Sequence, residues 1–266
     1  MYKIEIESDI KLDYNANEAF KALRANIGFC GKEIKVIAAT SCVPNEGKSV
    51  TTYQLAKSFA ASGKKVLYID ADMRKSVFKS RFGVSARNSG LSHFLSGLAE
   101  LNDVLGVTEF HGEQSDYAQM DDLNTYEVHM ILAGAVPPNP SELLGNERFL
   151  QLISYGKENY DYVLIDTPPI GAVIDAAVIA KQCDGVILIS KCGAISYRLA
   201  QKVTRQLRMA QCRILGVVYT MVPLATKSNN KYGYYKKGYY GSRYYSGYYG
   251  GGYYGYYGKS KDDEED

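Results

Sequence analysis

The sequence predicts an α/β fold: a doubly wound, mostly parallel sheet with helices on both faces, followed by a flexible tail. Three observations support this prediction. Apolar runs of strand length alternate with helical patterns over residues 1–226, as in parallel sheets. One run leads into a Gly-Lys-Ser loop, and two others end in acidic residues. From residue 227 the aliphatic residues disappear, so residues 227–266 are not expected to pack a core.

A first helix is predicted over residues 15–28, where apolar side chains recur at helical spacing. Asn15 and Asn17 are both candidates for its N-cap. The polar face carries Glu18, Lys21 and Arg24. On spacing alone, this face is interpreted as a solvated surface with local ion pairs.

A phosphate-binding loop is predicted after the apolar run Val36–Ala39. Gly47 allows close approach of the backbone to a phosphate, Lys48 can bridge the terminal phosphates, and the Ser49 hydroxyl can ligate Mg²⁺. Cys42 occupies the position where the usual motif has its first glycine, so the match is incomplete. The residues expected to surround a nucleotide are Pro44, Asn45, Glu46, Gly47, Lys48, Ser49 and Val50.

Acidic residues are predicted at the carboxyl ends of two further strands. A strand that starts at Lys65 runs into Asp70, Asp72 and Arg74, and the strand from Tyr162 ends at Asp166. Ligands of open parallel sheets bind outside these strand ends, so the acids should face the same crevice as the phosphate loop. Asp166 is a candidate Mg²⁺ carboxylate. The alternative for Asp70 and Asp72 is that they cap turns.

The remaining segments supply the other strands and helices. Residues 84–125 are polar and broken and predict little, whereas residues 128–132 predict a strand. Prolines then exclude a helix until Ser141, the expected cap of the next one. Further units of the sheet are predicted as helices over 172–182 and 195–209 and strands over 185–190 and 214–219.

Composition narrows the class of protein. The 31 basic and 29 acidic residues nearly cancel, which offers no electrostatic reason to expect nucleic-acid binding. The five cysteines show no C-x-x-C spacing, so a disulfide framework or zinc site is not expected and a reducing cytoplasm fits best. No signal sequence or membrane span is predicted, and the three histidines are expected to be structural or surface residues.

The tail, residues 227–266, is rich in tyrosine and glycine and ends in a run of acids. Considered alone, it can be interpreted as a sticky low-complexity segment that stacks on itself or on sugars. Its thirteen clustered tyrosines are Tyr232, Tyr234, Tyr235, Tyr239, Tyr240, Tyr244, Tyr245, Tyr248, Tyr249, Tyr253, Tyr254, Tyr256 and Tyr257.

Together these features resemble the bacterial tyrosine kinases, phosphate-loop enzymes of capsule and exopolysaccharide biosynthesis. The motifs that carry the resemblance are Pro44-x-x-Gly-Lys-Ser49, Asp70-x-Asp72-x-Arg74, the Gly134-x-x-Pro-Pro-Asn-Pro-x-Glu-Leu-Leu144 segment, Leu164-Ile-Asp-x-Pro-Pro169 and the tyrosine cluster. The resemblance implies that Lys48, Asp70, Asp72 and Arg74 are catalytic, with Asp70 as the base and Asp72 as a metal-site carboxylate. It also implies that ATP and Mg²⁺ are cofactors, and it implies autophosphorylation of the tail, with these thirteen tyrosines as the phosphoacceptors.

The resemblance further implies partners. In this family a Glu-x-x-Arg-x-x-Arg helix joins subunits into a ring, in which one tail enters the neighbouring active site. This chain has Lys21 in the middle of that motif, and Lys cannot make the bidentate pair of an Arg. A separate membrane adaptor of the polysaccharide co-polymerase type and a cognate phosphatase are also expected, with the kinase recruited to the inner face of the membrane.

Two other functions compete with this one. The first is a Min/Par-like ATPase switch, but those proteins usually carry an additional lysine early in the loop, where this chain has Ser41-Cys42-Val43. The second is a scaffold without catalytic activity, whose tail only binds.

Overall fold

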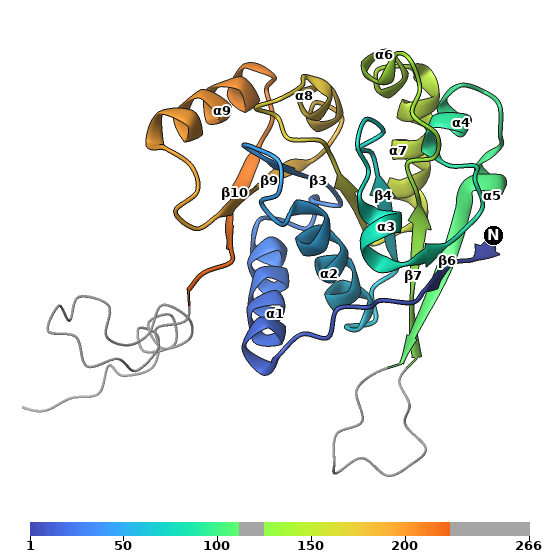
Figure 1. The fold of residues 1–266 in the computed structure, drawn as a ribbon, viewed down its shortest axis with the longest axis horizontal. Coiled ribbons are helices and arrows are strands. Elements are labelled where there is room, and N and C mark those ends of the chain that lie inside the picture. Colours follow the sequence, from blue (N-terminus) through green and yellow to red (C-terminus); the bar gives the residue numbers. More distant parts are fainter. Residues whose placement is uncertain (112–124, 224–266) are drawn as a thin grey trace, which may run out of the picture. The chain divides into compact units, whose positions relative to one another are not determined.

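The computed structural model describes residues 1–111 and 125–223, so the predicted tail and its tyrosines lie outside the described residues. An eight-stranded sheet runs through the described part (Figure 1). Its order is β1 (Tyr2–Lys3), β6 (Leu105–His111), β7 (Thr125–Ile131), β4 (Val66–Asp70), β8 (Tyr162–Asp166), β3 (Val36–Ser41), β9 (Gly185–Lys191) and β10 (Ile214–Thr220). The strands from β7 to β10 are parallel, and β6 pairs with β7 in the antiparallel sense.

Helices cover both faces of this sheet. Along β3, Val36 and Ala38 belong to one buried cluster and Ile37 and Ala39 to the other, as expected for a strand that is buried on both sides. The doubly wound, mostly parallel fold is confirmed. The helices are α1 (Tyr14–Phe29), α2 (Lys48–Ala60), α3 (Phe78–Phe82), α4 (Leu91–Leu95), α5 (Leu101–Val104), α6 (Pro140–Leu144), α7 (Glu147–Asn159), α8 (Asp175–Ala180) and α9 (Tyr197–Met209). None of these described helices is long and apolar enough to cross a bilayer.

Both predicted helix caps are wrong. Helix α1 is capped by Asp13, whose carboxylate accepts a hydrogen bond from the Ala16 N–H at 2.7 Å, so neither candidate asparagine is the cap. Helix α6 starts at Pro140, one residue before the predicted cap Ser141. Proline is tolerated there because the N–H groups of a first helical turn have no partner within the helix.

The segment that predicted little forms several elements. Between residues 84 and 111 the chain makes β5 (Val84–Ser85), which pairs with β2 (Glu5–Ile6), two short helices and the seven-residue strand β6. Strand β6 pairs with β7, the next strand along the chain, and with β1, about one hundred residues earlier, so its own residues give a weak signal. The predicted helix 172–182 is shorter, since α8 covers only Asp175–Ala180.

Asp184 directly precedes β9 and connects several segments at the amino ends of the strands, opposite the phosphate loop. Its carboxylate accepts the N–H groups of Lys35 at 3.1 Å and Val36 at 2.8 Å, and the Lys157 ammonium at 2.6 Å. Burial alone would raise the pKa of Asp184, but these three donors outweigh burial and lower it. One side chain thus joins the starts of β3 and β9 to the end of α7.

We expect Asp184→Asn to lower the free energy of unfolding at neutral pH by about 1–3 kcal/mol, because it removes a charged acceptor. A carboxylate with a lowered pKa in the folded state stabilises the fold above its unfolded pKa, and this stabilisation is lost as pH falls through the folded pKa. Urea unfolding of both proteins at neutral and acidic pH measures the difference. A gap that stays constant down to strongly acidic pH would contradict the role of the charge.

Candidate active site

The phosphate loop lies at the carboxyl end of β3, between the ends of β8 and β9. Two residues of the loop have a left-handed backbone, Asn45 with φ 65° and Gly47 with φ 82°. Gly47 occupies the N-cap position of α2, where a glycine adopts this conformation without strain. Lys48 and Ser49 are then the first two residues of α2, so the free N–H groups of the helix start point toward the loop.

Glu46 braces this loop from inside the protein. Its side chain is buried and accepts hydrogen bonds from the Val43 N–H at 2.9 Å, the Lys191 N–H at 3.1 Å and the Ser190 hydroxyl at 3.2 Å. The Thr220 hydroxyl donates to the Glu46 carbonyl at 2.7 Å. Of the residues predicted to surround the nucleotide, Glu46 therefore has its carboxylate turned into the fold. Only its backbone is left to face a ligand.

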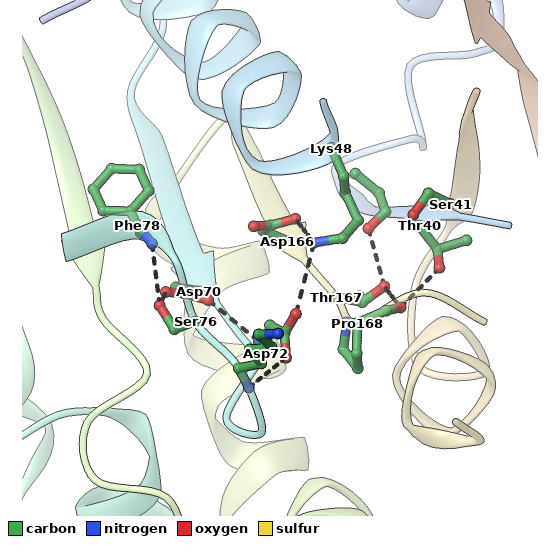
Figure 2. A network of polar contacts seen from close by, with 12 residues as sticks. Thr40, Ser41, Lys48, Asp70, Asp72, Ser76, Phe78, Asp166, Thr167 and Pro168 are labelled. Atoms are coloured by element: carbon green, nitrogen blue, oxygen red, sulfur yellow. Dashed lines mark hydrogen bonds and ion pairs between the residues drawn. The ribbon is translucent and has the colours of Figure 1, made fainter. Parts of the chain in front are cut away.

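Lys48 is at the centre of a cluster of carboxylates (Figure 2). Its ammonium lies 2.7 Å from Asp166 Oδ1 and 4.0 Å from Asp72 Oδ2, and all three side chains are buried or nearly so. Burial would lower the pKa of Lys48, but Asp166, Asp72 and Asp70 outweigh burial and raise it. The structure thus brings together four of the predicted site residues, from the ends of β4 and β8 and the start of α2.

Asp70 is fully buried at the end of β4. It accepts hydrogen bonds from the Asp72 N–H at 3.2 Å and from the Ser76 hydroxyl. Burial, reinforced by the neighbouring charge of Asp166, raises the pKa of Asp70 to about 7. A carboxyl group with a pKa near neutrality is suited to accept a proton at physiological pH.

Asp72 makes the contact expected of a turn cap and also lies beside Lys48. Its carboxylate accepts the Lys75 N–H at 3.0 Å, which is a turn-capping bond, and it also faces Lys48. Burial raises the pKa of Asp72 against the opposing effect of Lys48. The turn-capping interpretation is therefore supported for Asp72, and these bonds fix where the Asp70 and Asp72 carboxylates point.

Arg74 does not join the Lys48 cluster in the described residues. Its guanidinium donates from Nε and Nη2 to the two carboxylate oxygens of Asp175, at 2.7 and 2.9 Å, and from Nη2 to Ser141 Oγ at 2.9 Å. Ser141 in turn donates to Asp175 at 2.6 Å. This Arg74–Asp175–Ser141 triad ties the loop after β4 to α6 and α8. Sequence reasoning missed Asp175, and it assigned Ser141 to a cap.

The turn after β8 is fixed by threonines and a glycine that the sequence did not single out. The Thr40 hydroxyl donates to the Pro168 carbonyl at 3.0 Å, and the Thr167 hydroxyl donates to the Ala39 carbonyl at 3.0 Å. A Cβ on Gly171 would collide with the carbonyl oxygen of Cys42. These contacts hold the ends of β3 and β8 together and so fix the Asp166 carboxylate beside Lys48.

The oxygen atoms near Lys48 are suitable ligands for Mg²⁺, provided that nucleotide phosphates complete the coordination. In the part of the chain that the structure describes, no three His, Cys, Asp or Glu side chains form a metal site by themselves. Mg²⁺ is commonly held by one or two carboxylates together with waters and substrate phosphates. Asp72, Asp166 and the hydroxyl of Ser49 offer the hard oxygen ligands required.

The polar face of α1 is engaged within the subunit. Lys21 forms an exposed ion pair with Glu18 at 2.8 Å, and the Arg24 guanidinium donates to the Ser58 carbonyl on α2. Local pairing of this kind is what the solvated-surface interpretation expects. Glu18 and Lys21 remain largely exposed and accessible to a partner.

Comparisons with known proteins connect this site to a family. A family model described as an AAA domain matches residues 34–215. The tyrosine-protein kinase CpsD of Streptococcus agalactiae is 38% identical over 238 residues, which are 89% of this chain and 97% of that protein. The tyrosine-protein kinase YwqD of Bacillus subtilis is 34% identical over 221 residues, covering 82% of this chain and 86% of YwqD.

Solved structures agree with these relatives. The kinase domain of the Escherichia coli tyrosine kinase ETK superposes with a TM-score of 0.68 at 33% identity, covering 82% of this chain and 80% of that one. The septum site-determining protein MinD from Pyrococcus horikoshii, at 24% identity and a TM-score of 0.53 over 70% of both chains, shares the fold alone. Since tyrosine kinases match it over most of their own length, the chain belongs to the bacterial tyrosine kinase family.

Proposed function

We propose that this tyrosine kinase transfers phosphate from Mg²⁺-bound ATP to the tyrosines of its own tail, Tyr232–Tyr257, within a ring of identical subunits. The observation that carries the proposal is that four side chains meet at the carboxyl ends of the central strands: Lys48, Asp70, Asp72 and Asp166. A phosphoryl-transfer site needs a cation for the phosphates, oxygen ligands for the metal and a base for the attacking hydroxyl. This cluster offers all three.

The charges of the cluster suggest how the site works. Lys48 and Asp166 neutralise each other, and a bound nucleotide would offer a new partner to each: phosphates to Lys48, and a divalent cation to Asp166 and Asp72. Mg²⁺ would supply charge neutralisation at the transferring phosphoryl group. Asp70 would accept the proton of the tyrosine hydroxyl as its oxygen attacks in line.

The wider setting of the reaction is proposed from the family resemblance. The Glu18, Lys21 and Arg24 face would join subunits so that each tail enters its neighbour's site. A separate membrane adaptor would recruit the kinase from the cytoplasm to the inner face of the membrane and activate it. A phosphatase would reverse the reaction, and the cycle would regulate capsule or exopolysaccharide synthesis and export.

Lys48→Met is expected to abolish phosphotyrosine formation, because no other Lys or Arg among the described residues forms an ion pair with the carboxylates of this cluster. The measurement is incubation of the purified protein with labelled ATP and Mg²⁺, with and without its adaptor, followed by phosphoamino-acid identification. Circular dichroism confirms that the variant is folded. Undiminished labelling of tyrosine in folded Lys48→Met would remove Lys48 from the proposed mechanism.

Asp70→Asn is expected to abolish transfer and yet raise thermal stability without nucleotide and metal. The pKa of Asp70 in the folded state is about 7, well above its unfolded value. Ionisation of this carboxyl group therefore lowers the free energy of unfolding increasingly as pH rises from about 4 to 7. The gain should therefore be present at pH 8 and absent near pH 4. A purely turn-capping Asp70 predicts the opposite, a less stable variant that retains turnover.

Glu18→Lys is expected to shift the protein from oligomers to monomers and to reduce transfer between subunits. This substitution leaves the Arg24 bond to α2 in place, so it tests the exposed surface without loosening the fold. Analytical ultracentrifugation with ATP gives the mass, and Glu109→Lys, an equal charge change at an exposed site on β6, is the control. Identical sedimentation of wild type and Glu18→Lys would favour the solvated-surface interpretation.

A further inference from the structure

The balanced net charge of the chain conceals a strongly basic region. No aspartate or glutamate occurs between Asp184 and Asp262. Within this stretch, the described residues 185–223 form β9, α9 and β10 and carry six Lys or Arg residues. A solvated surface normally mixes both signs of charge, so a region without acids needs another explanation.

Most of these cations lie on the outer face of α9. The helix packs on the sheet through Val203 and Leu207, both fully buried. At 3.6 residues per turn, the opposite side of the helix carries four cations and a methionine. These are Arg198, Lys202, Arg205, Arg208 and Met209, and all five are exposed.

The four cations of α9 have no ionic partners within the described residues. Of the six Lys and Arg in this region, Arg213 is the one with a salt bridge in that part of the chain, to Glu33. Figure 1 shows α9 at the β10 end of the sheet, beside α8. Uncompensated cations on one face of a helix attract an anionic partner.

Apolar side chains accompany these cations. Met209 is 78% exposed, Tyr197 at the first turn of α9 is 76% exposed, and Ile174 before α8 is 66% exposed. Met209 and Ile174 border a groove of about 450 Å³ between α8 and α9, whose lining also includes Ala177 and Gln206. Exposed aliphatic and aromatic residues next to Lys and Arg are typical of surfaces that rest on a lipid headgroup layer.

We propose that the outer face of α9, with Tyr197, Met209 and Ile174 at its border, binds directly to an anionic lipid surface. The cations would be attracted to the headgroups, and the three apolar side chains would contact the interfacial layer. The helix itself does not insert, because its apolar side is already used in the core of the protein. A nucleic acid would use the same cations but would leave the apolar border without a role.

The test is sedimentation of the full-length protein with vesicles, without ATP. Wild type is expected to bind vesicles of equal parts phosphatidylglycerol and phosphatidylcholine, and not vesicles of phosphatidylcholine alone. Lys202→Glu with Arg205→Glu should weaken binding at least about tenfold, since each cation near an anionic surface contributes several-fold to affinity. Raising the salt concentration should weaken wild-type binding as well.

Lys11→Glu with Lys64→Glu is the matched control, because it changes the net charge equally at exposed lysines outside this region. It should bind like wild type. All these proteins keep the same tail, so any tail contribution cancels. If the α9 reversal lowers the melting temperature, Lys202→Gln with Arg205→Gln repeats the test with a milder change.

Two further arms define the ligand. Soluble glycerol phosphate, at the phosphate concentration of the vesicles, should not compete, whereas competition would show that a free phosphate suffices and would overturn the lipid assignment. Equal vesicle binding by the α9 and control variants would overturn the role of α9. Binding of duplex DNA through Lys202 and Arg205 without vesicle binding would assign the face to nucleic acid instead. None of these results depends on kinase activity.

Discussion

The site depends on one buried ion pair, between Lys48 at the start of α2 and Asp166 at the end of β8. Asp70 and Asp72 lie close to the same ammonium, so three carboxylates share one cation in a largely buried region. Removing an ion from water costs several kcal/mol, and the attraction within the pair must offset that cost. The sheet makes this arrangement possible because β4, β8 and β3 are neighbours. Their ends bring together residues that are far apart in the sequence.

Holding like charges together requires rigid support, and the surrounding loops supply it. Glu46 ties the phosphate loop to the end of β9. Ser76 positions Asp70 at the end of β4, the Lys75 N–H positions Asp72 just beyond it, and Thr40 fixes the turn after β8. None of these contacts adds chemistry of its own. Each restricts the motion of a backbone segment that carries a charged group, and pre-organisation of this kind lets charges act without reorganising during a reaction.

The sequence predicted the fold and the acids of the site because both depend on local patterns. Apolar runs followed by Asp70, Asp72 and Asp166 mark strand ends, and parallel strands share one ligand-binding edge. The missed features depend on tertiary contacts. Strand β6 exists through its partners, and the orientation of Glu46 depends on β9. The nearly neutral total charge likewise gave no indication of the basic face of α9, since composition does not say where on the surface the charged residues lie.

The triad of Arg74, Asp175 and Ser141 has an evolutionary consequence. Its members come from three segments more than thirty residues apart, yet each makes hydrogen bonds with both of the others. Replacing any one removes a hydrogen-bond partner from each of the other two, which still bond to each other, and a second substitution elsewhere would have to offset that cost. These three positions are therefore expected to change together or not at all among relatives. Their history should resemble that of a single inherited unit.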